Sequence, residues 1–407
     1  MKRAAVALFL LAGCGSEPKA ATAEFWAGVA TVEITPTRLV PLGGYGARKG
    51  KPMTGVHDPI YAKALWLETK DAKACIVTTD LIGSTLEIRD AIRPEGVPLV
   101  LAASHNHSGP GALAKGMWVM AMGKYDAEFT AELTAKLKKL VEDARSVVVP
   151  ARIAFARGEV PELVRNRRHK DGPVDPELNL FLVTDAMSRP LAVVTNFTAH
   201  GTVLPDENFL VSGDWPGAFQ RALERELGAT VLFTNGAEGD IAPRAPSGRD
   251  DFEKCAAIGD LLAARAATLV RGIEKKAERV TMSYVERGVE LPTPTLLLAP
   301  GKSVLGLLRL NDVRMFCFPG EPGVELGLEL KKRFPGSWVL GLANDHLGYF
   351  LTEEEFLKGG YEARVSFYGP KMGPWLLERF REIGEREHAE GRAGQSEGGR
   401  GENHDRR

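Results

Sequence analysis

The sequence of 407 residues has few cysteines, no excess of charge of either sign and no long apolar segment. Four cysteines are too few for the dense disulfide framework of a small secreted domain. Lys and Arg number 52 against 53 for Asp and Glu, so the chain has no basic field that would attract nucleic acid. The composition, with 44% hydrophobic and 26% charged residues, is that of a globular protein. We expect no nucleic-acid partner, and we infer no protein partner from the sequence.

The N-terminus has the pattern of an export signal. Lys2 and Arg3 precede an apolar run at residues 4–12, which is shorter than the roughly 20 residues that cross a bilayer and fits a secretory h-region. The run ends in Leu11-Ala12-Gly13-Cys14, which resembles the lipobox of bacterial lipoproteins. We therefore expect a lipoprotein signal peptide at 1–14, a linker at 15–23, and an exported protein anchored to the cell envelope through lipid on Cys14. A plain signal peptide in which Cys14 is incidental is the alternative.

Residues 24–381 contain no linker-like composition and no repeat, which predicts one large domain. Apolar spacing and capping residues predict helices at 126–144, 216–227 and from 251 to about 273. Short apolar runs without alternation are typical of strands buried on both faces, and they occur at 74–79, 97–103, 191–197, 230–234, 313–318 and 338–342. The predicted fold class is α/β, with mixed, largely buried β-sheets flanked by helices. From Glu382 the chain loses its apolar residues, so we expect a disordered polar tail at 382–407.

Polar side chains follow five of these predicted strands. They are His105 and His107 after 97–103, His200 after 191–197, Glu238 and Asp240 after 230–234, Glu321 after 313–318, and His346 and Tyr349 after 338–342. Functional sites in α/β sheets gather outside the carboxyl ends of strands. The sequence therefore predicts one convergent site at the C-terminal ends of the strands.

The chemistry of this set favours a metal. His105 and His107 are two residues apart and would share one side of an extended segment. With His200 and Glu321 they supply the nitrogen and oxygen donors that zinc accepts. The alternatives are satisfied buried polar residues or a nucleophilic Ser-His-Asp triad, although no Gly-x-Ser-x-Gly elbow, P-loop or dinucleotide-binding glycine motif occurs in the chain.

These segments also carry a family resemblance. The chain resembles the catalytic N-terminal domain of the neutral/alkaline non-lysosomal ceramidases, a family of zinc amidases, from Ala27 to Phe380 in matching order. The segments that carry it are SHNHSGPGA at 104–112, NFTAHGT at 196–202, FPGEP at 318–322, GLANDHLGYFLTEEEFLKGGYEA at 341–363 and SFYGP at 366–370.

The resemblance implies a set of site residues. The ligands of one zinc ion would be His105, His200, Glu321 and Tyr349, while His107 and Tyr361 would stabilise the oxyanion and Arg167 would contact the polar end of the substrate. A dication would lower the pKa of the Tyr349 phenol from its ordinary value near 10. From its place after a strand, Asp240 is predicted to orient a ligand histidine. Asp214 is a candidate for the same role or for a helix cap.

The chain departs from the family at Ala242, where the family has a serine. Zinc-activated water needs no serine, so the predicted function is zinc-dependent hydrolysis of an N-acyl amide, either ceramide-like or another lipid or small-molecule amide. A zinc hydrolase of another bond, such as an ester or lactone, is one alternative. A non-catalytic envelope lipoprotein that uses the same fold as a binding module is the other.

Overall fold

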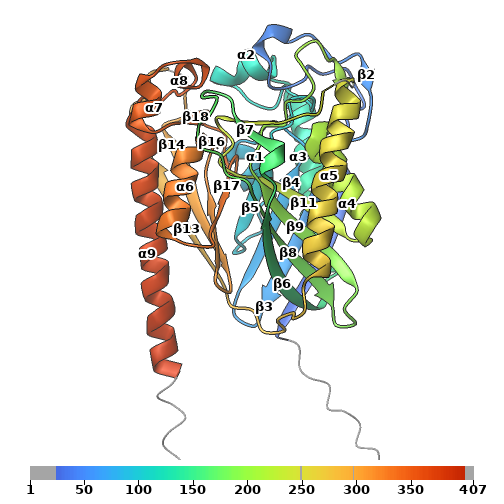
Figure 1. Cartoon of the computed structure of the whole chain (residues 1–407), viewed down its shortest axis with the longest axis vertical. Coiled ribbons are helices and arrows are strands. Elements are labelled where there is room, and N and C mark those ends of the chain that lie inside the picture. The colour runs from blue at the N-terminus through green and yellow to red at the C-terminus, as the bar shows by residue number, and fades with distance from the viewer. Residues whose placement is uncertain (1–23, 248–249, 297, 399–407) are drawn as a thin grey trace, which may run out of the picture.

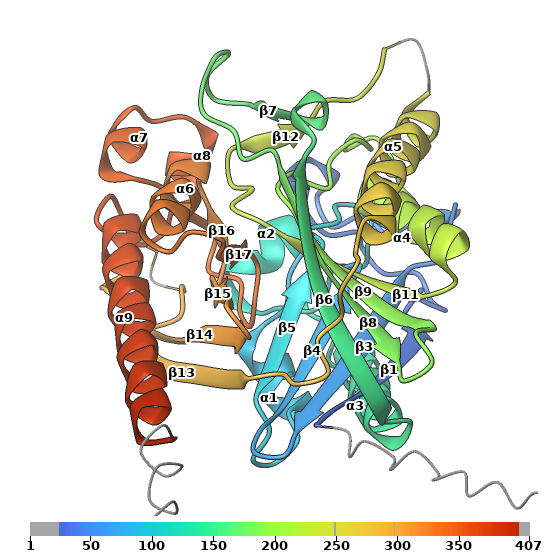
Figure 2. The same ribbon diagram turned by 60° about the horizontal axis from the view of Figure 1, so that its bottom comes forward.

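The computed structural model describes residues 24–247, 250–296 and 298–398, which form stacked layers of helices and sheets (Figures 1 and 2). The large sheet has eight strands in the order β11-β9-β8-β6-β1-β3-β4-β5. Their bounds are β1 (Phe25–Glu33), β3 (Tyr61–Thr69), β4 (Lys73–Thr79), β5 (Leu99–Ala103), β6 (Val149–Glu159), β8 (Glu177–Asp185), β9 (Pro190–Phe197) and β11 (Thr230–Asn235). The sheet is mixed, because β4 and β5 run parallel, as do β9 and β11, while the other neighbours are antiparallel.

Four helices cover one face of this sheet, namely α1 (Leu86–Ile92), α3 (Ala127–Ser146), α4 (Asp214–Leu227) and α5 (Asp251–Arg271). Side chains on a strand alternate between the two faces. In β3, Trp66 therefore packs with α1 and α3, whereas its neighbour Leu65 faces the opposite way. Both are fully buried, as expected for a sheet that is covered on both sides.

A second, four-stranded sheet covers the other face. Its strands are β13 (Met282–Glu290), β14 (Lys302–Leu310), β15 (Val313–Cys317) and β17 (Trp338–Leu340). Its inner face shares a core with the large sheet, in which Leu308 and Trp338 pack with Leu65. Its outer face packs against α6 (Val324–Arg333) and α9 (Met372–Gly398) through a separate core. The order of layers is therefore helix, sheet, sheet, helix.

Short elements connect these layers on the side of the candidate site. They are β2 (Gly55–Val56) paired with β10 (Leu210–Val211), β7 (Val164–Asn166) with β12 (Ile241–Pro243), and β16 (Glu321–Pro322) with β18 (Tyr349–Phe350). The short helices are α2 (Val119–Met122), α7 (Glu353–Leu357), α8 (Tyr361–Arg364) and the 3-10 turns η1 (Gly46–Arg48), η2 (Gly116–Trp118) and η3 (Pro161–Leu163). Figure 2 shows β7 and β12 beyond the upper ends of the large sheet.

The predicted helices and strands are confirmed, as is the α/β fold class. The six predicted strands are β4, β5, β9, β11, β15 and β17, and the three predicted helices are α3, α4 and α5. Helix α5 begins where the Asp250 carboxylate accepts a hydrogen bond from the Glu253 N–H at 2.9 Å. Helix α4 ends at Gly228, whose positive φ of 62° suits a glycine C-cap.

The prediction of a disordered tail is wrong for residues 382–398, because α9 continues to Gly398. Ile383 is buried in the outer core, and the buried Glu387 carboxylate binds Arg309 and Arg314 at 2.6 and 2.9 Å. A helix that is polar on most sides can still dock through a single apolar stripe, which in α9 includes Phe380 and Ile383. Residues 399–407 and the predicted signal peptide and linker at 1–23 lie outside the described residues. Across the described ranges, no helix is both long enough and apolar enough to cross a bilayer.

Candidate active site

The structure brings the predicted strand-end residues together. His105 follows β5 and His200 follows β9. The next residue after each histidine, Asn106 and Gly201, form a parallel β-bridge that holds the two segments side by side. Glu321 and Tyr349 are direct partners in the parallel pair β16–β18. All four predicted ligand residues are at most 6% exposed. The structure thus brings these four predicted residues to one place.

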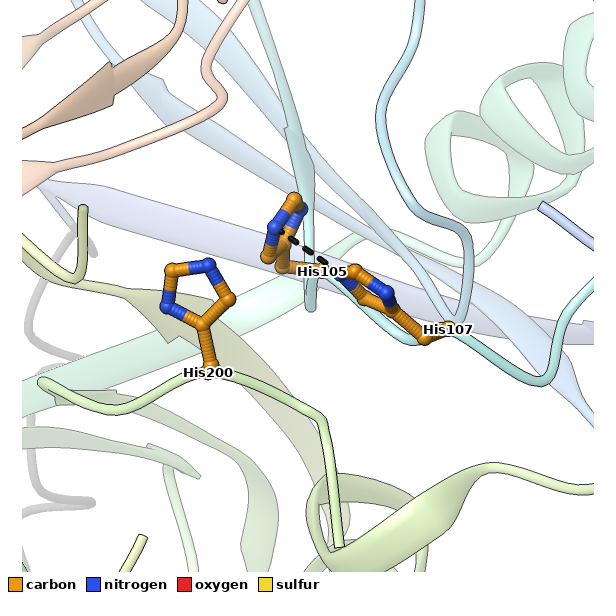
Figure 3. Close-up of side chains that lie close together, drawn as sticks. All are labelled: His105, His107 and His200. Atoms are coloured by element: carbon orange, nitrogen blue, oxygen red, sulfur yellow. Dashed lines mark hydrogen bonds between the residues drawn. The ribbon is translucent and has the colours of Figure 1, made fainter. Parts of the chain in front are cut away.

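The two histidines of the His-x-His segment meet for a different reason than the predicted one. His105 has a positive φ of 61°, so the segment turns there and is not an extended strand. The turn places His105 between His107 and His200, with ring centroids 4.7 and 4.6 Å away (Figure 3). Positive φ is uncommon for residues other than glycine and is concentrated at functional sites.

The hydrogen bonds fix which nitrogen of each ligand histidine faces the centre. His105 Nδ1 lies 2.8 Å from the Ile82 carbonyl oxygen, and His200 Nδ1 lies 2.8 Å from the Glu238 carbonyl oxygen. Because a carbonyl oxygen can only accept, both Nδ1 atoms must carry the proton. Nε2 of each ring therefore faces the centre, and a proton on Nδ1 is the tautomer in which Nε2 binds a metal.

Acceptor atoms face one another across this centre. Glu321 Oε2 lies 3.1 Å from His105 Nε2 and 3.3 Å from His200 Nε2, and the Tyr349 hydroxyl lies 3.1 Å from His200 Nε2. Ligand atoms about 2.0–2.1 Å from a tetrahedral zinc ion are separated by about 3.3 Å. Glu321 Oε2 is buried and has no hydrogen-bond partner among the described residues, although it faces two imidazole nitrogens, so the residues present fit a zinc ion at this centre.

The charges of Glu321 and Tyr349 are set by burial and by each other. Burial would raise the pKa of the Glu321 carboxyl, but the His105, His200 and His346 imidazoles hold that pKa well below its usual range. Burial and the Glu321 charge together raise the pKa of the Tyr349 phenol well above 10. Without a cation Tyr349 is therefore neutral, and its conversion to a ligand requires the positive charge of a metal.

His107 belongs to the same cluster but faces the pocket. Its Nε2 lies 3.2 Å from His105 Nε2, and its buried Nδ1 has no hydrogen-bond partner among the described residues. Gly44, at a φ of 101°, supports the ring, because a Cβ there would lie 2.3 Å from His107 Nδ1. His107 could complete a three-histidine metal group with His105 and His200. Its contact with the pocket and its lack of a carbonyl partner for Nδ1 distinguish it from those two residues.

The pocket leads to the centre and has a volume of about 740 Å³. His107, Arg167 and Tyr361, the residues predicted to act on the substrate, line it together with the predicted ligand Tyr349. Arg167 donates to the Tyr349 hydroxyl at 3.1 Å and to the Gly239 carbonyl at 2.9 Å, and it pairs with Glu362 at 2.8 Å. Its side chain is partly buried and is held by these three contacts.

The two predicted aspartates have structural contacts. The Asp240 carboxylate accepts from the Val324 N–H at 2.7 Å, at the start of α6, and from Asn166 at 3.2 Å, so it contacts no histidine in the described ranges. The prediction that Asp240 orients a ligand histidine is therefore wrong, because backbone carbonyl groups do so instead. Asp214 is the first residue of α4, not its cap, and its carboxylate accepts from the backbone N–H groups of Leu204 and Trp215.

Two further buried residues border the centre and were not assigned a role from the sequence. His346 Nε2 lies 3.0 Å from Glu321 Oε1, so it orients the carboxylate whose other oxygen faces the ligand histidines. Trp118 stacks on His346 at a centroid distance of 4.1 Å. Glu238 is fully buried, and neither carboxyl oxygen has a hydrogen-bond partner among the described residues. Burial and the Glu321 charge raise the pKa of Glu238 well above its ordinary value, which favours the neutral carboxyl. His346 and Glu238 both follow predicted strands, and that position in the sequence is the signal by which they could have been assigned to the site.

Comparisons with known proteins identify relatives. Residues 25–258 match the family described as neutral/alkaline non-lysosomal ceramidase, N-terminal. A neutral ceramidase of Pseudomonas aeruginosa is 24% identical over 233 residues, which are 50% of this chain and 34% of the relative. A neutral ceramidase of Mycobacterium tuberculosis is 26% identical over 406 residues, covering 71% of this chain and 62% of the relative. In these matches the chain spans less than two thirds of the length of the relatives.

The fold has solved counterparts. A crystal structure of the Pseudomonas aeruginosa neutral ceramidase superposes with a TM-score of 0.81 at 18% identity, covering 88% of this chain and 74% of that chain. A structure described as ceramidase complexed with C2 superposes with a TM-score of 0.80 at the same identity. These superpositions show that the fold is shared across most of the chain.

Proposed function

Since the chain belongs to the neutral/alkaline non-lysosomal ceramidase family, we propose that it is a zinc-dependent hydrolase of N-acyl amides. The observation that carries the proposal is the convergence of two imidazole lone pairs, one carboxylate oxygen and one phenol at spacings of 3.1–3.3 Å. The residues that would hold the metal are His105, His200, Glu321 and Tyr349. When bound, zinc supplies a Lewis acid and lowers the pKa of water from about 15.7 toward about 7.

The remaining residues of the site bind the amide and handle its charge. His107 lines the pocket beside His105, and burial together with the neighbouring imidazoles lowers its pKa, so its ring is neutral at pH 7. A neutral imidazole can donate a hydrogen bond to the oxygen on which charge develops. Tyr361 lies at the pocket wall with its ring centroid 5.9 Å from that of Tyr349, where its hydroxyl can do the same. Arg167 holds Tyr349 in place and adds positive charge nearby.

Ala242 shapes the substrate side of the site. It is 7% exposed, lies on β12 and lines the pocket. A methyl group offers no hydrogen bond, so a substrate hydroxyl beside it would lose a partner. The substrate that we propose is therefore a ceramide-like or other N-acyl lipid amide with no hydroxyl to satisfy at that point.

A matched pair of substrates tests the proposed function. Purified protein loaded with zinc is assayed on an N-acyl amide and on the ester with the same acyl chain. The expected result is amide hydrolysis that a chelator abolishes and added zinc restores. Hydrolysis of the ester or a lactone without the amide would instead make the protein a zinc hydrolase of another bond, and turnover of none of them would favour a binding module.

We also propose that the chain is exported and carries lipid on Cys14, which would hold it at the cell envelope. The proposal rests on the basic, apolar and Leu-Ala-Gly-Cys pattern of residues 2–14. Buried acyl methylenes contribute about 0.8 kcal/mol each, so several chains anchor a protein stably. Labelled palmitate is expected to enter the wild type and not the Cys14→Ser variant. A membrane-bound wild type without label would contradict the lipid anchor.

A further inference from the structure

The mouth of the pocket carries two arginines that the proposed reaction does not use. Arg165 on β7 and Arg244, which follows β12, both line the pocket and are exposed. The strands pair antiparallel, with Ala242 opposite Arg165, and the Arg244 N–H donates to the Leu163 carbonyl at 2.8 Å. Residues opposite each other and residues two apart share a face of a ladder. Arg165, Ala242 and Arg244 therefore project from the same face toward the pocket.

The other charged groups on the pocket wall are already neutralised. Lys254 binds Asp251 at 2.7 Å, and Arg167 binds Glu362 at 2.8 Å. In contrast, no side-chain carboxylate of the described residues lies within ion-pair distance of Arg165 or Arg244. Diagonal neighbours on a ladder are about 7–8 Å apart, a spacing across which two long arginine side chains can reach the same anion. The mouth thus holds about two uncompensated positive charges.

The rest of the lining is polar or small. Val203 is the one large aliphatic side chain among the described residues that line the pocket, whose other members include glycines, tyrosines and charged groups. An acyl chain gains its affinity from long apolar walls, whereas the apolar groups here are short: one valine, two prolines and three alanines beside the tyrosine rings. The half of an N-acyl amide that fits here is therefore the amine half.

We propose that Arg165 and Arg244 form a binding site for an anionic group on the amine half of the substrate, such as a carboxylate, sulfonate or phosphate. This inference rests on the proposed function for its assignment of the substrate as an amide. Guanidinium groups bind such anions through paired, charge-assisted hydrogen bonds. The small side chain of Ala242, opposite Arg165 and two residues before Arg244, leaves room for the anion. The substrate class is an N-acyl amino acid or an equivalent anionic amide.

A binding experiment tests the site without requiring turnover. The probes are ketomethylene analogues, in which a methylene group replaces the amide nitrogen, with an octanoyl chain and either a terminal carboxylate or a terminal hydroxyl group on the amine side. Their dissociation constants are measured by calorimetry on the zinc-loaded protein. We expect the carboxylate to bind about tenfold or more tightly than the hydroxyl, because charge-assisted hydrogen bonds are about twice as strong as neutral ones. The preference should shrink as salt screens the charges.

Two double variants, each of which removes two positive charges, test whether Arg165 and Arg244 cause the preference for the carboxylate probe. Arg165→Gln with Arg244→Gln is expected to reduce the ratio of the two constants to less than about twofold, since the remaining contacts do not distinguish the probes. Arg271→Gln with Lys275→Gln removes the same charge at the far end of α5, about 30 Å away along the helix, and should leave the ratio unchanged. A third probe, with the carboxylate at the end of the acyl chain, should show no preference over the hydroxyl analogue.

Equal binding of the first two probes by the wild type would overturn the proposal. So would a preference that survives the loss of Arg165 and Arg244, or one shown by the acyl-side carboxylate. Because binding is measured on analogues that cannot be hydrolysed, a protein that binds the anion but cleaves no amide would refute the proposed function and leave the anion site standing.

Discussion

The inner end of the pocket and its mouth differ in how tightly the fold holds them. At the inner end, His105, His200 and Glu321 are almost fully buried, and each has a partner that fixes its orientation. At the mouth, Arg165 and Arg244 are exposed, and no side chain of the described ranges binds their guanidinium groups. Rigid support is what a metal centre needs, whereas a specificity surface can change without cost to the core.

The difference between the two regions suggests that the inner end sets the reaction class and the mouth sets the substrate. His105 and His200 follow β5 and β9 of the large sheet, and Glu321 and Tyr349 pair on β16 and β18, so their positions depend on the whole fold. The mouth is built by the short ladder of β7 and β12, where one substitution alters charge or size without disturbing a core. The reaction class should therefore follow the family, and the substrate should be particular to this chain.

Loss of an inner ligand should have the largest effect. His200→Ala removes one nitrogen donor and leaves Glu321 facing a vacant position, so we expect zinc to fall from about one per chain to a small fraction. Metal analysis after dialysis measures this, with circular dichroism as the check on folding. His57→Ala, which replaces a histidine outside the centre, is the control and should keep its zinc. Full zinc content in His200→Ala would mean that the centre has been assigned wrongly.

A variant of His107, which lies between the metal centre and the pocket, tests whether this residue binds the metal or acts on the substrate. Because it faces the pocket, His107→Ala should keep the metal and lose turnover by about 10²–10³, the usual cost of one oxyanion donor. Zinc content and kcat, measured on the same preparation, separate the two roles. Zinc loss as large as that of His200→Ala would place His107 among the ligands instead.

Asp240 tests whether the support of the inner region is structural. Asp240→Ala leaves the Val324 N–H and Asn166 without their acceptor, which should lower the free energy of unfolding by about 1–3 kcal/mol. Denaturant titration measures the loss, and zinc content should not change. A stable variant with reduced zinc would restore the sequence-based prediction that Asp240 acts on the metal centre.

The smallest effect is expected at Ala242. Ala242→Ser adds one hydroxyl to the pocket wall, so kcat/KM should change by the roughly 0.5–1.5 kcal/mol of an ordinary hydrogen bond. The preference should shift toward amides whose amine half carries a nearby hydroxyl. Competition between such an amide and its deoxy counterpart measures the shift. Turnover confined to the serine variant would contradict a mechanism that needs no serine.

The sequence predicted the inner region well because its signals are local. A histidine or glutamate directly after a buried apolar run is visible in a short window, and sheet topology then brings the strand ends together. The reason given for His105 and His107 was nevertheless wrong, because a positive φ at His105 cannot be read from the spacing.

The remaining errors concern contacts between distant segments. Asp240 follows β11 like a site residue, but it binds the start of α6, some 84 residues further along the chain. The tail was predicted to be disordered from its composition, although Glu387 pairs with arginines 73 and 78 residues earlier. Arg165 and Arg244 lie close together only because β7 pairs with β12, and no short sequence pattern predicts that pairing.

Anomalous diffraction at the zinc absorption edge, on crystals of the protein prepared with zinc, tests the metal centre most directly. The account predicts one strong peak within about 2.0–2.3 Å of His105 Nε2, His200 Nε2, a Glu321 oxygen and the Tyr349 oxygen. A peak held by His107 in place of Tyr349, or no peak among these four residues, would contradict it.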